Sequence, residues 1–296
     1  PRTGTTKLQR VLSCDSKNQH LPLWQILNPS RRLIENEKRS QKDPRILIAN
    51  EFIELLKKSN SSFLTAHPMF SEEAEEESFL IESDLKSLSN CTRVRAPSYW
   101  NAIKDQTTRE SYDFLKSMLQ YIQWQRGSSN TPWILKSPLH IGRLKNLLEV
   151  FPDALVIHCI RDPLVSLPSN CRIVEAFRSL SSDNIDLQEL GIEQLNTWST
   201  QLNVFTDSYK DIPKSHLIHA RYDDIQTKVQ SVIARVYAQL NRPVSNELLS
   251  QLKSWEKAHP QHEFGQHKYS LERYSLDPAS VEQAFHRYRS EFIKNN

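Results

Sequence analysis

Three short segments of the sequence carry residue types that bind anions or move protons. The first is PRTGTT, residues 1–6, in which Arg2 offers a planar fork of donors and Gly4 permits close approach of the backbone. Thr5 and Thr6 add hydroxyl groups, and a helical pattern follows at once over residues 4–14. Unpaired N–H groups and the helix dipole attract anions at a helix start, so this turn could bind a phosphate-like group. The alternative is an ordinary frayed helix start, and GxxxxGK[ST], the Walker A pattern, is absent.

The second segment is IRDPLVSLPSNCRI, residues 160–173. Arg161 stands at the end of an apolar run, and Asp162 and Pro163 are typical of a helix N-cap and first helical position. Pro168 lies inside that helix, where proline costs about 3 kcal/mol, and Ser169 follows it. Arg161 is therefore either an anion-binding group or a strand-end partner in an ion pair.

The third segment is WILKSPLH, residues 133–140. Lys136 ends a short apolar strand, Ser137 can cap the next helix and Pro138 suits its first position. His140 falls in the first turn, where the helix dipole disfavours a positive charge, so a neutral imidazole that accepts a proton is expected there. The alternative is a histidine that only packs at a helix start.

The elements around these segments alternate between strands and helices. Apolar runs predict strands at WILK (133–136) and ALVIHCI (154–160), and ALVIHCI is apolar almost throughout, as in a parallel sheet buried on both faces. A further strand is predicted at HLIHARY (216–222). Helices are predicted over 71–88, 107–126, 138–150, 186–210, 223–240, 244–257 and 279–293, and a charged loop over 30–44. This is the pattern of an α/β fold, a doubly wound parallel sheet flanked by many helices with its ligand at the carboxyl ends of the strands. In that fold a phosphate loop follows the first strand, so the first strand is expected before residue 1.

Size and composition indicate one globular domain over residues 1–296. Hydrophobic residues make up 38% and charged residues 25%, and a net charge of +3 with interleaved signs argues against nucleic-acid binding. No apolar stretch approaches the roughly 18–20 residues of a membrane span. The four cysteines have no CxxC spacing, so neither a metal site nor a disulfide framework is expected, and a reducing cytoplasm is the predicted compartment.

Taken together, the three segments resemble the sulfotransferase superfamily, most closely the bacterial-type family with a PR[ST]GTT loop. The order of PRTGTT, LKSPLH and R-x7-S from Arg161 to Ser169 carries the resemblance. The segments AHPMFSEEAEE (66–76), FGQHKYSLE (264–272) and AFHRYRSEF (284–292) also look like that family. The resemblance implies a P-loop-like sulfotransferase fold.

It also implies transfer of a sulfuryl group from 3′-phosphoadenosine-5′-phosphosulfate (PAPS) to a hydroxyl or amine of a small, natural-product-like molecule. The displacement would be in line and would leave 3′,5′-adenosine bisphosphate (PAP). By resemblance, the 5′-phosphosulfate would be held by Arg2, Thr3, Gly4, Thr5 and Thr6, and the 3′-phosphate by Arg161 and Ser169. Lys136 would lie beside the reacting group, and Gly265, His267 and Lys268 would close over the nucleotide. A sulfuryl group carries less charge than a phosphoryl group, so no metal ion is expected.

The general base is the open part of this interpretation. His140 is the first candidate, by its approximate correspondence with the catalytic histidine of cytosolic sulfotransferases, and His67 and Glu73 are the others. Many relatives carry Trp-Glu where this sequence has Trp24-Gln25, and a glutamine cannot act as a base. The run EEAEEE (72–77) is either a solvated helix face or an attractor for a cationic acceptor.

Two other functions stay open at this point. A P-loop kinase or nucleotide hydrolase would share the architecture but should show GK[ST] and a Mg²⁺-binding aspartate. The second alternative function is that of a non-catalytic nucleotide-binding protein on a degenerate sulfotransferase fold. The sequence says nothing about the oligomeric state.

Overall fold

The strands form two parallel pairs in this computed structural model, which describes residues 1–30, 42–59, 63–64, 67–87, 89–103, 108–127, 131–259 and 270–294. β1 (Gln19–His20) pairs with β2 (Trp133–Ile134), and β3 (Val156–Ile160) pairs with β4 (Leu217–Arg221). In the longer pair the register runs from Val156 opposite Leu217 to Ile160 opposite Arg221. The three predicted strands are confirmed, but within the described residues they belong to two short sheets instead of one continuous sheet.

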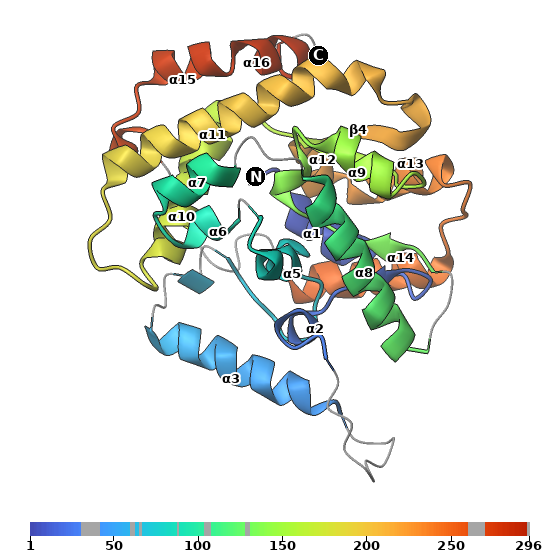
Figure 1. Cartoon of the computed structure of the whole chain (residues 1–296). Helices are drawn as coiled ribbons and strands as arrows, with labels where there is room; N and C mark the ends of the chain where they lie inside the picture. Colours follow the sequence, from blue (N-terminus) through green and yellow to red (C-terminus); the bar gives the residue numbers. More distant parts are fainter. Residues whose placement is uncertain are drawn as a thin grey trace.

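Helices surround these strands (Figure 1). In Figure 1, α11 crosses the upper part of the molecule with α15 and α16 above it, and α3 lies at the lower edge. No helix in the described ranges is long and apolar enough to cross a membrane. The α-helices are α1 (Thr5–Leu12), α2 (Leu23–Leu27), α3 (Pro44–Ser59), α5 (Ser78–Ile81), α6 (Asn90–Arg93), α7 (Pro97–Ile103), α8 (Arg109–Gln125), α9 (Leu144–Val150), α10 (Pro163–Arg178), α11 (Leu187–Ser208), α12 (Tyr222–Thr227), α13 (Val229–Gln239), α14 (Asn246–Ala258), α15 (Pro278–Ala284) and α16 (His286–Phe292).

Most of the predicted helices are confirmed, although several are divided. The segment 138–150 contains the 3-10 turn η2 (Pro138–His140) and then α9, 223–240 contains α12 and α13, and 279–293 contains α15 and α16. The helices α2, α3, α6 and α7 were not predicted from the sequence. The loop predicted at 30–44 lies largely outside the described residues.

The first helix is fixed by its apolar face. Leu8, Val11 and Leu12 are buried in one cluster with Ala220 of β4 and Ile233 of α13. Helical spacing puts the three α1 side chains on one face, and their burial holds the helix against the second strand pair. As a result the N-terminus of α1 lies beside α12, the helix that follows β4.

The start of α10 is built as the sequence predicts. The Asp162 carboxylate accepts a hydrogen bond from the Leu164 N–H at 3.0 Å, and Pro163 occupies the first helical position. The same carboxylate accepts two hydrogen bonds from Arg289 of α16, at 3.0 and 2.9 Å. The helix continues through Pro168 to Arg178 and carries Ser169 in its buried interior.

The prediction of a helix from Ser71 to Leu88 is wrong over its first half. Residues 71–77 contain no helix, and Ala74 forms an antiparallel bridge with Pro22. The Glu75 N–H donates to the Leu21 carbonyl at 2.9 Å, which takes the backbone out of helical pairing. Only α5 and the 3-10 turn η1 (Glu82–Asp84) are helical in this region.

Candidate active site

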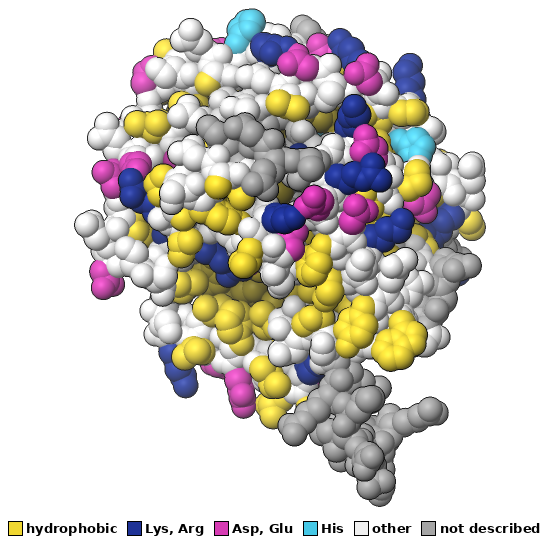
Figure 2. Space-filling model, in the orientation of Figure 1, with side chains coloured by type: hydrophobic (Ala, Val, Ile, Leu, Met, Phe, Trp, Pro, Cys, Tyr) yellow, Lys and Arg dark blue, Asp and Glu magenta, His cyan; other side chains and the backbone are white. Residues whose placement is uncertain are grey.

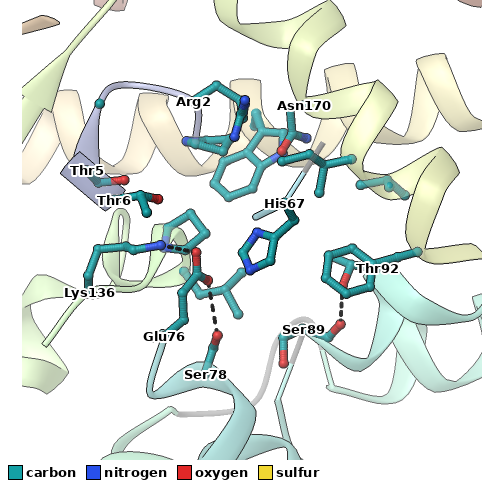
Figure 3. Close-up of a pocket in the computed structure, with 18 of the residues that line it drawn as sticks. Arg2, Thr5, Thr6, His67, Glu76, Ser78, Ser89, Thr92, Lys136 and Asn170 are labelled. Atoms are coloured by element: carbon teal, nitrogen blue, oxygen red, sulfur yellow. Dashed lines mark hydrogen bonds and ion pairs between the residues drawn. The ribbon is translucent and has the colours of Figure 1, made fainter. Parts of the chain in front are cut away.

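One cavity collects residues from all three segments that the sequence singles out. Its volume is about 280 Å³, and it lies where the opening turn, the residues after β2 and β3, the second half of α10 and the start of α12 meet (Figure 3). The residues proposed from sequence that line it are Arg2, Gly4, Thr5, Thr6, His67, Lys136 and Arg161. The other wall includes Glu76, Glu82 and Ser89, with Phe79, Phe177 and Trp198 among its apolar members.

The opening turn is shaped by Gly4. Its φ of +82° lies in the left-handed region, and it is the N-cap of α1. A Cβ atom there would come within 3.2 Å of Gln226 Nε2 and 3.3 Å of the Tyr222 and Ile225 side chains, all on α12. A glycine therefore suits this position both for its backbone angle and for the space beside it. Thr5 and Thr6, the first residues of α1, project toward the cavity in Figure 3.

Arg2 and Arg161 contact each other at one end of the cavity. Arg2 donates through Nε to Ser169 Oγ at 3.0 Å, and Arg161 donates through Nη1 to the Arg2 carbonyl at 2.9 Å. The Arg161 guanidinium also lies 4.0 Å from the centre of the Tyr222 ring. Neither arginine has a carboxylate partner within the described part of the chain. Partly buried cations without a counter-charge are unfavourable, so this end of the cavity is suited to an anion.

Two of the proposed anion-binding residues lie just behind the wall. Ser169 is buried under the Arg2 side chain, and Thr3 is half-buried inside the turn. Gly265, His267 and Lys268, the proposed closing residues, lie outside the described residues.

Lys136 faces the cavity with a carboxylate beside it. Its ammonium group forms an ion pair with Glu76 Oε1, and Glu76 Oε2 accepts from the Ser78 hydroxyl at 3.2 Å (Figure 3). The backbone N–H of Lys136 donates to Glu77 Oε2 at 2.6 Å. Glu77 is fully buried, which favours its neutral form, but hydrogen bonds from His140 and from backbone N–H groups outweigh burial and lower its pKa. The ionised Glu77 therefore fixes the backbone at Lys136.

His140 lies away from the cavity wall. Its Nε2 is 2.5 Å from Glu77 Oε1, and its Nδ1 is 3.0 Å from the Tyr112 hydroxyl. Both ring nitrogens are thus engaged by other side chains. The structure does not bring this candidate base to the cavity, and the reason is the partnership with Glu77, which is remote in sequence.

Glu73 is also outside the wall. Its carboxylate is 2.9 Å from Arg10 Nε and 3.0 Å from His259 Nε2. This second candidate base therefore belongs to an ion-pair cluster between α1 and the end of α14.

His67 is the candidate base that lines the cavity. It is 9% exposed, and Figure 3 shows its imidazole between Glu76 and Thr92. Its Nε2 lies 3.4 Å from Glu75 Oε1. Burial alone would raise the pKa of Glu75, but the facing His67, with Lys136 and Arg10 nearby, lowers it to about 2. An ionised carboxylate therefore stands behind this imidazole.

The glutamate run 72–77 is not a solvated helix face, which corrects the sequence interpretation. Glu75 and Glu77 are 3% and 0% exposed. Every glutamate of the run faces a basic group of the chain. The pairs are Glu72 with Lys42, Glu73 with Arg10, Glu75 with His67, Glu76 with Lys136 and Glu77 with His140. Glu75, Glu76 and Glu77 therefore order residues at and behind the cavity wall. Among the described residues, no group of three or more His, Cys, Asp or Glu side chains could hold a metal ion.

Sequence reasoning missed several residues of the wall, among them Glu76 and Tyr222. Glu76 was considered only as part of an acidic cluster, and Tyr222 was not considered at all. The position of Tyr222 directly after β4 could have predicted its place in the wall, because ligands bind at the carboxyl ends of parallel strands. Gln25 is buried and accepts a hydrogen bond from Arg126, and it does not line the cavity.

A family model described as "Sulfotransferase family" matches residues 1–246. The chain belongs to the sulfotransferase family. Two solved sulfotransferase structures resemble it: STF9 from Mycobacterium avium has a TM-score of 0.83 and 25% identity, over 99% of this chain and 75% of that one. STF1 from Mycobacterium tuberculosis has a TM-score of 0.79 and 26% identity, over 96% of this chain and 73% of that one. The expected α/β sulfotransferase fold is thereby confirmed.

Curated relatives match part of this sulfotransferase. The ω-hydroxy-β-dihydromenaquinone-9 sulfotransferases Stf3 of Mycobacterium bovis and Mycobacterium tuberculosis are each 24% identical to it over 171 residues. The match covers 57% of this chain and 44% of the relative's length.

Proposed function

We propose that this sulfotransferase moves the sulfuryl group of PAPS to a hydroxyl or amine of a small-molecule acceptor by in-line displacement. The observation that carries the proposal is the pair of guanidinium groups, Arg2 and Arg161, which share one cavity and have no carboxylate partner in the described ranges. The named acceptor of the Stf3 relatives is a hydroxylated small molecule, which supports the acceptor class.

The cavity residues fit the two anionic groups of the donor. The Gly4 turn and the start of α1 offer N–H groups and the Thr5 and Thr6 hydroxyls to a phosphosulfate. Arg161 would hold a 3′-phosphate, with Ser169 behind the wall orienting Arg2, and the nearby Tyr222 ring offers a flat surface at the same end. PAPS supplies the sulfuryl group when it is bound.

Lys136 is the group we assign to charge stabilisation. Its ammonium lines the cavity below Thr5 and Thr6 in Figure 3, and its ion pair with Glu76 fixes its direction. A positive donor at this place would stabilise charge that develops on the leaving oxygen, and most of the catalysis would come from such positioning. Glu77, His140 and Tyr112 act as positioning residues, since they hold the backbone at Lys136.

His67 is the general base in this proposal. It is the one of the three sequence candidates that reaches the cavity wall, and the Glu75 carboxylate lies 3.4 Å behind its Nε2. We propose that the opposite nitrogen, Nδ1, accepts the acceptor's proton. An ionised Glu75 would then stabilise the imidazolium that forms.

The test is release of PAP from PAPS with a panel of primary alcohols and amines, with and without EDTA. We expect acceptor-dependent release that EDTA does not change. Turnover of ATP that EDTA abolishes would favour the P-loop kinase instead. Tight PAP binding without turnover of any acceptor would favour the non-catalytic nucleotide-binding protein. Failure to bind PAP or PAPS at all would overturn the proposed function.

A further inference from the structure

A second, smaller cavity lies next to the proposed active site. Its volume is about 50 Å³, and its lining comes from α2, α3, α10 and the residues before α5. Apart from Arg93, every residue that lines it is aliphatic, aromatic or methionine. A cavity with so little polar lining offers few hydrogen bonds to water, so it favours apolar contents.

Phe79 and Phe177 separate the two cavities. Both rings line the larger cavity and the smaller one, and both are half-buried. Figure 2 shows hydrophobic side chains gathered around a hollow on this face, above α3. A molecule that reacts in the larger cavity can therefore extend past these two rings without leaving apolar surroundings.

Arg93 does not place an unpaired charge in the small cavity. Its guanidinium lies 4.8 Å from the centre of the Phe79 ring and 5.3 Å from that of Phe177. Its Nε is 2.8 Å from Glu82 Oε2, and Glu82 lines the larger cavity. The pair carries no net charge, and the guanidinium lies over the two rings, so no unpaired charge stands between the cavities.

We propose that the acceptor is amphiphilic, with its hydroxyl or amine beside His67 and an apolar tail that passes Phe79 and Phe177 into the small cavity. This inference rests on the proposed function, because that function places the acceptor in the larger cavity. The α3 residue Leu56 and the α10 flank residue Leu180 then determine how much tail is accepted, since both line the small cavity.

The experiment is calorimetric titration of straight-chain 1-alkanols of increasing length, roughly four to nine carbons, into the native chain. Burial of each methylene should tighten binding about fourfold until the cavity is full. Leu56→Trp fills the cavity and should flatten this dependence. Leu55→Trp is the matched control, because Leu55 is the next residue on α3 and is 61% exposed, so it should keep the native dependence.

A second cavity-filling variant separates loss of tail binding from a folding defect in Leu56→Trp, since Leu56 is buried at 9% exposure. Leu180 lines the same cavity but is 37% exposed, so Leu180→Trp can enter from the surface and should flatten the length dependence as well. Native affinities that do not rise with chain length, or an unchanged rise in both folded filling variants, would overturn the amphiphilic acceptor. PAP titration of the same samples reports separately on the proposed function: a flat alkanol series with tight PAP binding rejects only the tail site, and absent PAP binding rejects the proposed function.

Discussion

Exchange of Gly4 for alanine tests whether the opening turn holds the donor. At a φ of +82°, alanine is in the left-handed region, which costs about 1–2 kcal/mol. The added Cβ would lie 3.2 Å from Gln226 Nε2 and 3.3 Å from both Tyr222 and Ile225, so α12 or the turn must shift by a few tenths of an ångström. Such crowding adds about 1–3 kcal/mol, and we expect a total loss of roughly 2–5 kcal/mol of unfolding free energy.

Donor binding should suffer more specifically. Displacement of the turn costs at least one charge-assisted hydrogen bond to the phosphate, about 1.5–3 kcal/mol, so the dissociation constant of PAP should rise about 10- to 100-fold. The assay is calorimetric titration with PAP at a temperature where the variant is folded, with thermal unfolding recorded in parallel. A loss of roughly 2–5 kcal/mol corresponds to a fall in Tm of roughly 3–8 °C for a chain of this size.

Gly127→Ala is the matched control. Gly127 has a φ of +64° but nothing within 4 Å of the position of a Cβ. Alanine there carries the backbone cost without the crowding, so stability should fall by about 1–2 kcal/mol and PAP affinity should not change. Equal PAP affinities for the two alanine variants would refute the assignment of the Gly4 turn to the donor.

The other predictions concern the cations and histidines. Arg161→Ala should weaken PAP binding about 30-fold through loss of a charge-assisted contact, whereas Arg235→Ala, which removes the same charge from an exposed α13 residue, should leave the calorimetric dissociation constant within twofold. His67→Gln should lower kcat about 100-fold with unchanged PAP affinity, and a kcat near the native value would reject this residue as the base. Burial, together with the facing His219 at 3.0 Å, holds the pKa of His158 well below its usual 6.5. As the pH falls, this histidine is therefore protonated in the unfolded chain before it is protonated in the folded chain. The free energy of unfolding, measured with urea, should fall as the pH drops below about 6.5, and the loss should reach about 1.4 kcal/mol at pH 5.5. His158→Phe should reduce this pH dependence, and an unchanged slope would contradict the assignment.

The sequence by itself determined the local features of this protein. Apolar runs located β2 and β3, because such runs are typical of strands in a parallel sheet. Asp162 and Pro163 located the start of α10, since capping and the proline φ are local properties. The same holds for the turn at Gly4, whose left-handed backbone favours glycine. Dihedral preference and backbone hydrogen bonding act within a few residues, so a sequence pattern can express them.

Only the tertiary structure decided which charged residues reach the cavity. Lys136 meets Glu76 and His140 meets Glu77 across separations of 60 and 63 residues, and these pairings turn an apparently solvated acidic run into buried wall. They also withdraw His140 from the cavity and leave His67 on its surface. The energy of a buried charge depends on partners brought from distant parts of the chain, and no local pattern of residues contains that information.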